Sequence, residues 1–334
     1  MSDLNSEILS TLALNYAESG AGLELVELHK YLHRNGNNGR RPTLIEITKA
    51  LYELRKIGLV FEHENVFSVA SCSDAGKPAC NASQTRSRYG VSGERSDAGR
   101  QKEKRAEMSK EKIERLRTPL KWLAVLPFLN AIAITGSVAM NSATKSSDLD
   151  LLIIVKPGRI WTTRILAMIV TQFFGKRRYN KKITDRICLN YFIVDGAETP
   201  TQNIASANML ASARPILGKE NFAAFISRNR WMEKFLYQCH DAEAIAPIQI
   251  SYPSKTSIVL GKLLGGKFGD WMECLLKKWQ TARIKRKLAG KTDTDQLIFT
   301  DDILMLHYPE SKNTRVMKRY SDKIKELGVT NQEL

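Results

Sequence analysis

The sequence contains no apolar run long enough to cross a lipid bilayer. A membrane-spanning helix needs about 18–20 consecutive apolar residues, whereas the longest candidate, residues 165–174, is shorter and includes Thr171 and Gln172. The first residues also lack the basic and apolar regions of a secretory signal peptide. We therefore expect a cytoplasmic protein with no membrane partner.

The cysteines lack the spacing of a metal site. Cys72 and Cys80 lie eight residues apart in a polar stretch, but no histidine or further cysteine lies nearby to complete a zinc site. Free thiols in a reducing compartment are the expected state. The five cysteines are Cys72, Cys80, Cys188, Cys239 and Cys274.

Acidic residues are few relative to basic ones. The chain has 51 Lys and Arg against 35 Asp and Glu, which gives a formal net charge of +16. Such an excess favours partners that carry phosphate, namely nucleotides, DNA or RNA, or an anionic surface. Charge alone does not separate a nucleotide substrate from a polynucleotide partner.

The length of 334 residues suggests two or three domains. Residues 1–70 predict three helices followed by a β-hairpin, with a capping box in which Thr43 precedes Glu46 by three residues. This segment resembles a winged-helix domain, mainly through residues 51–60. Such a domain contacts either DNA through its third helix or another protein, and the few basic residues on that helix leave both readings open.

Two further segments connect this region to the rest of the chain. Residues 71–100 are poor in large apolar residues and predict a flexible linker. Residues 101–126 predict a charged, solvated helix whose apolar end, residues 120–126, docks on a sheet.

The segment 132–155 reads as an apolar strand, a turn at Gly136-Ser137, a polar connection and a second apolar strand. The second strand opens with Asp148 and Asp150, which point to the same face because strand side chains alternate. Two carboxylates beside a turn with free backbone N–H groups can hold a divalent metal next to a bound phosphate.

The remaining chain predicts an α/β arrangement followed by a mainly helical region. An apolar helix is expected over residues 159–174, a basic loop over 175–182 and a third strand over 186–194. In the C-terminal region, residues 297–306 are expected to be a short strand or irregular. Helices are expected at residues 203–210, 222–237, 260–288 and 314–327.

The central segment resembles the nucleotidyltransferase superfamily, which includes DNA polymerase beta and the minimal nucleotidyltransferases. Its pattern is an apolar strand, Gly-Ser, about ten residues, then Asp-x-Asp and another apolar strand. A closer resemblance, over residues 127–237, is to an uncharacterised prokaryotic group of nucleotidyltransferase-domain proteins that also has an N-terminal winged helix. The residues that match the superfamily pattern are Gly136, Ser137, Ala139, Ser147, Asp148 and Asp150.

The resemblance implies an α+β fold: a mixed-sheet nucleotidyltransferase core at residues 101–200, preceded by the winged helix and followed by a helical region at residues 201–334. It implies Mg²⁺ or Mn²⁺ held by Asp148 and Asp150, and transfer of a nucleoside monophosphate from a nucleoside triphosphate to an acceptor. The phosphates would be bound by Gly136, Ser137, Ser147 and Lys145.

The sequence departs from the family pattern at two positions. Asn141 stands where a second glycine is usual, but Asn tolerates a left-handed backbone. Asn190 stands where we expect the third catalytic carboxylate, and it binds metal weakly and accepts no proton at pH 7. Asp185 and Asp195 each lie five residues from Asn190, an odd offset that predicts the opposite strand face.

These departures leave two main hypotheses. The first is a Mg²⁺-dependent nucleotidyltransferase, and the second is a nucleotide- or DNA-binding regulator that uses the same fold without turnover. A third class, a toxin–antitoxin component that modifies a protein or tRNA, is also compatible with the sequence.

Overall fold

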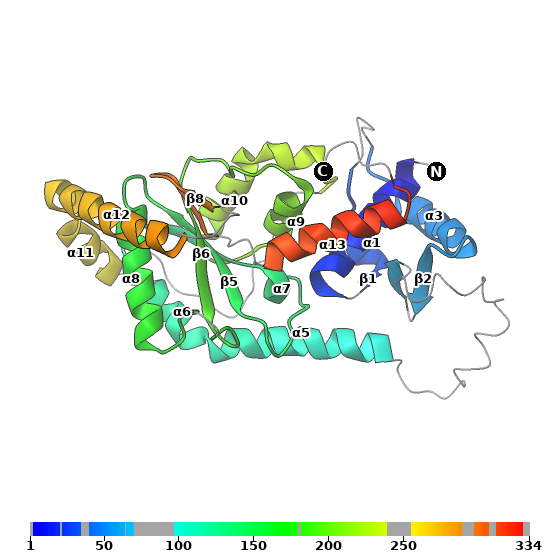
Figure 1. Ribbon diagram of the computed structural model, residues 1–334, viewed down its shortest axis with the longest axis horizontal. Helices are drawn as coiled ribbons and strands as arrows, with labels where there is room; N and C mark the ends of the chain where they lie inside the picture. Colours follow the sequence, from blue (N-terminus) through cyan, green and yellow to red (C-terminus); the bar gives the residue numbers. More distant parts are fainter. Residues whose placement is uncertain are drawn as a thin grey trace.

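The computed structural model describes most of the chain and shows a mixed α/β structure (Figure 1). Residues 71–96 of the predicted linker lie outside the described residues, while residues 97–100 belong to helix α5 (Asp97–Arg115). The described residues are 3–20, 22–34, 40–63, 65–69, 97–179, 182–238, 255–288, 297–306 and 312–329.

The N-terminal residues form three helices and a small antiparallel sheet with the strand order β1-β3-β2. The predicted capping box at the third helix is confirmed. The Glu46 N–H donates to the Thr43 hydroxyl at 3.3 Å, and the Thr43 N–H donates to the Glu46 carboxylate at 2.7 Å. The elements are α1 (Asp3–Ser19), β1 (Leu23–Glu24), α2 (Leu25–Lys30), α3 (Leu44–Lys56), β2 (Val60–His63) and β3 (Val66–Val69).

A six-stranded mixed sheet with the order β7-β4-β5-β6-β9-β8 forms the centre of the molecule. Strands β5 and β6 are parallel, and the other neighbouring pairs are antiparallel. The apolar runs of β4 and β5 are buried, as expected for central strands. The strands are β4 (Leu129–Thr135), β5 (Leu149–Val155), β6 (Ile187–Val194), β7 (Arg214–Leu217), β8 (Leu297–Phe299) and β9 (Ile303–Leu306).

Strand β7 was not predicted from the sequence, which indicated only helices between residues 203 and 237. Pro215 lies within it, and proline argues against a strand because it cannot donate a backbone hydrogen bond to a neighbour. The structure resolves this because β7 is at the edge of the sheet and pairs only with β4. The C-terminal region is therefore less helical than predicted and supplies three strands to the central sheet.

Helices cover both faces of this sheet (Figure 1). One face packs against α6 (Arg117–Leu123), α8 (Ile160–Phe173) and the last part of α12 (Gly266–Leu288). The predicted helix at 260–288 is two helices, because Gly266 adopts a positive φ of 60° between α11 and α12. The remaining helices are α7 (Gly136–Ala139), α9 (Ile204–Ser212), α10 (Lys219–Arg228), a 3₁₀ helix (Arg230–Lys234), α11 (Lys255–Leu263) and α13 (Lys312–Glu326).

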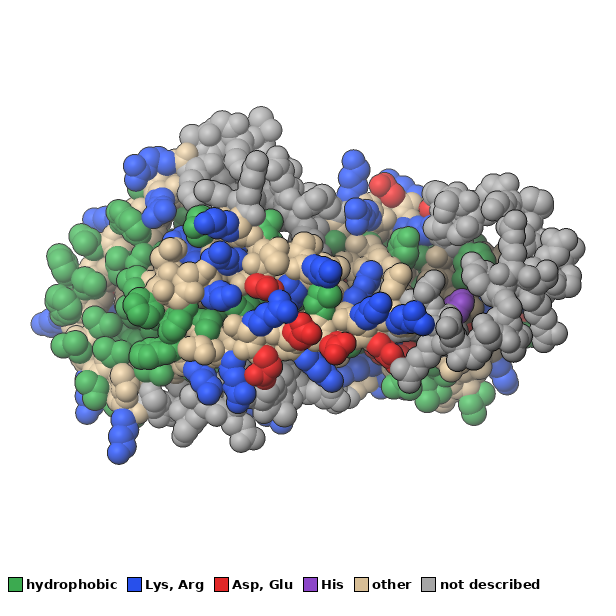
Figure 2. All heavy atoms as spheres, turned by 90° about the horizontal axis from the view of Figure 1, so that it is seen from below, with side chains coloured by type: hydrophobic (Ala, Val, Ile, Leu, Met, Phe, Trp, Pro, Cys, Tyr) green, Lys and Arg blue, Asp and Glu red, His purple; other side chains and the backbone are tan. Residues whose placement is uncertain are grey.

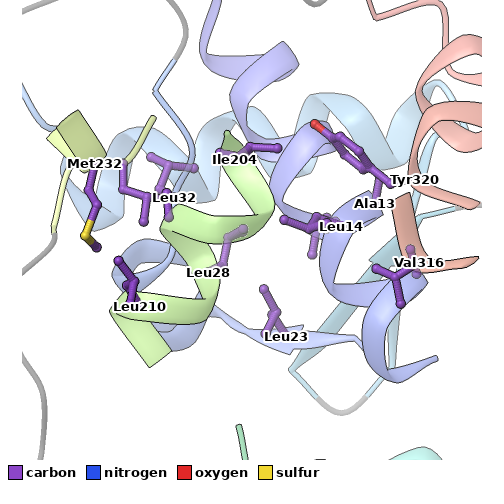
Figure 3. Close-up of a cluster of buried hydrophobic side chains, with 14 of the residues drawn as sticks. Ala13, Leu14, Leu23, Leu28, Leu32, Ile204, Leu210, Met232, Val316 and Tyr320 are labelled. Atoms are coloured by element: carbon purple, nitrogen blue, oxygen red, sulfur yellow. The ribbon is translucent and has the colours of Figure 1, made fainter. Parts of the chain in front are cut away.

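The two ends of the chain share one hydrophobic cluster on the other face of the sheet. Helix α13 crosses α1, and Figure 3 shows Tyr320 and Val316 beside Ala13 and Leu14, with α9 close to the N-terminal helices. A buried hydrogen bond of 2.7 Å joins the Ser10 hydroxyl to the Tyr320 hydroxyl. Burial of apolar side chains thus ties the N-terminal unit to the sheet and to the last helix.

The surface differs between the two ends of the molecule. Figure 2 shows hydrophobic side chains gathered at the end that carries α6, α8 and α11, where Trp122, Ile169 and Phe173 are exposed. Charged residues of both signs lie along the middle of the same face, over α5. Among the described residues, no helix is both long enough and apolar enough to span a membrane.

Candidate active site

Strand β4 ends in a tight turn whose backbone conformation favours glycine. Gly136 has a φ of +68°, a conformation that other residues rarely adopt, and a Cβ atom there would lie 2.9 Å from Asp150 Oδ2. The turn therefore brings its backbone directly against a carboxylate of the neighbouring strand.

Two carboxylates meet at the start of β5, as the alternation of strand residues predicts. Asp148 immediately precedes the strand, and Asp150 lies within it, opposite Thr135 of β4 and Cys188 of β6. The ligand atoms of Asp148, Asp150 and Cys188 all lie within 4.8 Å of one another. This is the one cluster of three or more Asp, Glu, Cys or His side chains with such spacing in the described part of the chain.

An arginine stands between these carboxylates. Residues 176–178 run beside the start of β6, where the Arg178 N–H donates to the Ile187 carbonyl at 3.1 Å. The Arg178 guanidinium donates to Asp148 Oδ2 at 2.5 Å and to Cys188 Sγ at 3.3 Å, and its Nη1 atom lies 4.0 Å from Asp150 Oδ1. A protein cation thus compensates the paired negative charges.

The surroundings raise the pKa values of Asp148 and Cys188 in this cluster. Burial, and then the charge of Asp150, raise the pKa of Asp148 to about 6, while the Arg178 guanidinium opposes the rise. Burial and both carboxylates raise the pKa of the Cys188 thiol well above its usual value. At neutral pH the cluster therefore offers carboxylate oxygens and a protonated thiol.

This donor set fits a hard divalent cation. Carboxylate oxygens are the ligands that Mg²⁺ and Mn²⁺ prefer, and Asp148 and Asp150 supply them from one strand face. A protonated thiol is a poor ligand for either ion, so Cys188 adds no strong bond. A bound cation would replace the Arg178 guanidinium in compensating the carboxylates.

A buried lysine holds the loop between the two strands. Lys112 of α5 is 3% exposed, and its ammonium donates to the carbonyls of Lys145 and Ser147 at 3.0 and 2.9 Å and to Asp185 at 2.7 Å. Ser109 of the same helix accepts a hydrogen bond from the Ala143 N–H at 3.2 Å. The helix predicted to be solvated is therefore exposed on one side only and clamps the loop on the other.

The predicted phosphate-binding residues lie around this loop. The Ser137 hydroxyl donates to the Ser147 hydroxyl at 3.3 Å, and the Thr144 N–H donates to the Ser147 hydroxyl at 2.9 Å. Ser137 and Ser147 thus meet beside the Gly136 turn. The Lys145 side chain is exposed, and Lys145 contacts the clamp only through its carbonyl.

Asn141 closes the turn in the conformation expected for it, with a φ of 52°. Its side-chain oxygen accepts a hydrogen bond of 3.2 Å from Arg214, which lies on β7 opposite Ile134 of β4. Arg214 therefore places a second guanidinium beside the turn.

The comparison with protein families agrees with this geometry. Residues 113–193 match the nucleotidyltransferase domain. The match begins in α5, includes the Gly136 turn, both carboxylates, Arg178 and Cys188, and ends in β6. No curated protein and no solved structure matches the chain.

Within the matched segment, the residue of β6 that pairs with Asp150 is Cys188 rather than Asn190. The pairing of β5 with β6 shifts between Asp150/Cys188 and Leu152/Tyr191, so that Leu189 and Asn190 lie opposite the single residue Leu151. Asn190 was named from the family resemblance, whereas the side chain grouped with the two aspartates is that of Cys188. A catalytic role for Asn190 stays a prediction.

The two acids that flank β6 have partners elsewhere. Asp185 pairs with Lys112 at 2.7 Å and Arg115 at 3.1 Å, and these hydrogen bonds hold its pKa below the usual value although burial alone would raise it. Asp195 pairs with Arg228 and accepts a hydrogen bond of 2.7 Å from Asn130. Neither belongs to the cluster of Asp148, Asp150 and Cys188.

Sequence reasoning did not single out four residues of the candidate site: Cys188, Arg178, Lys112 and Arg214. Arg178 belongs to the basic loop that the sequence did indicate, but nothing distinguished it from its neighbours. The partners of Lys112 and Arg214 lie more than thirty residues away in the chain, so no local pattern reveals them.

Proposed function

We propose that the protein is a nucleotidyltransferase that uses Mg²⁺, or Mn²⁺, to move a nucleoside monophosphate from a nucleoside triphosphate to an acceptor. The observation that carries the proposal is the pair Asp148 and Asp150, set against the Gly136 turn inside the segment that matches the nucleotidyltransferase domain. Carboxylates beside a glycine turn suit a metal that accompanies a triphosphate.

Each part of the site then has a task. Asp148 and Asp150 would hold the ion, which would supply positive charge beside the phosphate oxygens. The backbone at Gly136, with the hydroxyls of Ser137 and Ser147, accepts the terminal phosphates. Arg178, released from Asp148, and Arg214 neutralise the pyrophosphate that leaves.

A second function, nucleotide binding without turnover, is favoured by one specific observation. The position beside Asp148 and Asp150 on β6 holds Cys188, and its raised pKa makes it a poor proton acceptor. Within the described residues, no third carboxylate joins the pair. A regulator that senses a nucleotide would need the metal and the turn but not a base.

Incubation of the purified protein with Mg²⁺ and each labelled nucleoside triphosphate distinguishes the two functions. The assay is run with and without tRNA, DNA and cell extract, and it follows pyrophosphate release and label transfer. Turnover that is lost in Asp148→Ala with Asp150→Ala supports the enzyme. Nucleotide binding without turnover supports the regulator, and turnover unaffected by the double change contradicts the site.

We further propose that the N-terminal unit is a winged helix that contacts DNA, RNA or a protein. Its three helices and three-stranded antiparallel sheet support this fold. On α3, Arg55 is ion-paired with Glu62 and the Lys56 ammonium lies over the Tyr52 ring, while Leu44, Ile45 and Tyr52 are exposed. Exposed apolar residues and paired cations favour a protein partner over DNA.

A mobility-shift assay of the full-length protein on random duplex DNA and on tRNA tests this choice. A shift that strengthens at low salt and is lost in Lys49→Gln supports nucleic acid. The protein-contact proposal is contradicted if that shift appears and Ile45→Asp leaves the association state of the protein unchanged.

A further inference from the structure

A second charged site lies on the face of the sheet opposite the carboxylates. It is a small pocket of about 40 Å³ between α8, α12 and residues 176–178, lined mainly by Arg164, Arg177, Arg283, Trp279 and Gln280. In Figure 1, α8 and α12 lie together at one end of the molecule. None of these side chains takes part in the carboxylate cluster.

The two sites face opposite ways because strand residues alternate. Met168 and Ile284, which also line the pocket, belong to the hydrophobic cluster that contains Leu149 and Leu151 of β5. Asp148 and Asp150 alternate with those leucines and therefore point to the other face. The same alternation separates Arg178, on the carboxylates, from its neighbour Arg177, in the pocket.

The pocket gathers three arginines, and two of them, Arg177 and Arg283, form no ion pair with a carboxylate of the described residues. Burial, and then the charge of Arg283, lower the pKa of Arg177. Among the described residues, no carboxylate lies within ion-pair distance of Arg177 or Arg283. Other arginines of the sheet and its helices are paired, for example Arg178 with Asp148 and Arg159 with Asp270 at 2.6 Å.

The side chains around these arginines are held in place. Arg164 donates to Gln280 Oε1 at 2.5 Å, and Gln280 Nε2 donates to the Trp161 carbonyl at 2.9 Å. The Arg283 guanidinium lies over the Trp279 ring, 5.6 Å from its centre. Like charges gathered in fixed positions around a hollow are costly unless an anion compensates them.

We propose that this pocket binds a phosphate group. A tetrahedral phosphate presents several acceptor oxygens, which match the planar, forked donors of guanidinium groups better than a single carboxylate does. The pocket is open to solvent beside the exposed Arg283, so the remainder of a larger phosphate-bearing ligand can extend outward. The site is separate from the triphosphate site of the proposed function and does not depend on it.

Calorimetric titration of the full-length protein with inorganic phosphate tests the proposal. The buffer contains EDTA, because a metal on Asp148 and Asp150 would itself attract anions, and it has physiological ionic strength. Phosphate is expected to bind in the millimolar range or more tightly. Arg177→Gln with Arg283→Gln is expected to weaken that binding about tenfold or more.

A matched control removes two positive charges from α12 outside the pocket. Lys278→Gln with Lys285→Gln takes two exposed cations from α12 outside the pocket and is expected to leave phosphate binding unchanged within about twofold. Because Arg283 is exposed, Arg283→Gln alone preserves the fold and should weaken binding by itself. Equal weakening in the control and pocket variants, or no binding by the wild type, overturns the proposal.

Two further titrations identify the source of the phosphate. If ribose 5-phosphate binds as inorganic phosphate does and loses affinity in the pocket variant, the site recognises the terminal phosphate of a small molecule. Binding by inorganic phosphate and not by the ester assigns it to the free ion. A short oligonucleotide that binds where neither of these does would contradict a single-phosphate site.

Discussion

The two faces of the central sheet carry charged sites of opposite sign that are balanced differently. On one face, two carboxylates are compensated by Arg178, so that the negative site holds its own cation. On the other face, Arg177 and Arg283 have no carboxylate partner among the described residues, so their positive charge is not compensated by an ion pair there. At the carboxylate site, an incoming cation has to displace the Arg178 guanidinium. At the arginine pocket, an incoming anion compensates charges that have no partner.

The two sites can be followed by separate binding measurements. Binding of Mn²⁺ reports on the carboxylate face, and binding of phosphate in EDTA reports on the arginine pocket. A substitution on one face should change one measurement and leave the other unchanged, unless residues 176–178, which contribute to both, transmit the effect.

Replacement of Lys112, the buried lysine that holds the loop between β4 and β5, should have the largest effect. Lys112→Met removes an ammonium that is 3% exposed and leaves the carbonyls of Lys145 and Ser147 without their donor. We expect the free energy of unfolding to fall by about 3 kcal/mol and Mn²⁺ binding to weaken, with phosphate binding retained. Denaturant unfolding and both titrations measure this.

Lys110→Met is the matched control, because Lys110 is exposed on the same helix and its replacement should change stability by less than about 0.5 kcal/mol. A Lys112→Met protein as stable as this control would show that the clamp contributes nothing. Loss of phosphate binding in Lys112→Met would show that the two faces are coupled.

The clamp also shows what the sequence could and could not predict. Local periodicity was sufficient for the strand, turn and strand around Gly136, and it placed Asp148 and Asp150 on one face. A charge run on a helix reads as solvated whether or not one lysine turns inward, because the partner of Lys112, Asp185, lies 73 residues away. Nothing in the local pattern separates Lys112 from Lys110.

The third position of the carboxylate site was beyond prediction for a different reason. The family resemblance placed this position at Asn190, whereas the register of β5 with β6 sets Cys188 opposite Asp150 and shifts before Leu152 and Tyr191. Pro215 concealed β7 in the same way, because only the edge position of the strand makes a proline acceptable there. Register and edge position are properties of the whole sheet.

Substitution of the turn glycine should have the next largest effect, confined to the carboxylate face. Gly136→Ala places a methyl group 2.9 Å from Asp150 Oδ2 in a backbone with φ of +68°. We expect a loss of about 2 kcal/mol in stability and of Mn²⁺ binding, because Asp150 must move. Phosphate binding in EDTA should persist.

Gly158→Ala separates backbone strain at positive φ from the close approach of a Cβ atom to Asp150. Gly158 has the same φ of +68°, but a Cβ atom there meets nothing within 4 Å. It should lose stability through backbone strain and keep its Mn²⁺ binding. If Gly136→Ala also keeps Mn²⁺ binding, the close approach to Asp150 has no role in the metal site.

The pKa of Asp148 gives a smaller effect with a defined sign. Because burial and Asp150 raise this pKa from 3.8 to about 6, the native state binds the proton more tightly than the unfolded state does. The contribution to stability is full below about pH 4 and is lost as pH rises through about 6. Asp148→Asn should therefore stabilise the metal-free protein by about 1–2 kcal/mol above that range.

Unfolding curves at several pH values check this prediction. The advantage of Asp148→Asn should disappear below about pH 4, where the wild-type carboxyl is also neutral. Asp301→Asn, at a surface carboxylate that is 65% exposed and paired with Lys277, is the control for a general change of charge. A stabilisation of Asp148→Asn that is the same at every pH would mean that charge is not its cause.

Replacement of Arg178 should have the smallest effect. It tests whether a divalent cation displaces the Arg178 guanidinium from the two carboxylates. Arg178→Gln removes the guanidinium that donates to Asp148 at 2.5 Å, so a divalent cation no longer has to displace it. We expect Mn²⁺ affinity to rise about tenfold at about pH 8, where Asp148 is ionised in both proteins. Phosphate binding in EDTA should not change.

Lys176→Gln is the control for a general loss of positive charge, because Lys176 lies two residues away on the same segment. Equal gains in Mn²⁺ affinity for both variants would mean that Arg178 acts only through the overall field. A gain in Arg178→Gln alone, together with slower nucleotidyl transfer, would show that the guanidinium competes with the cation for the carboxylates and also acts on the triphosphate. A cation that only stabilised the fold would change neither measurement, since its loss would appear in the unfolding free energy alone.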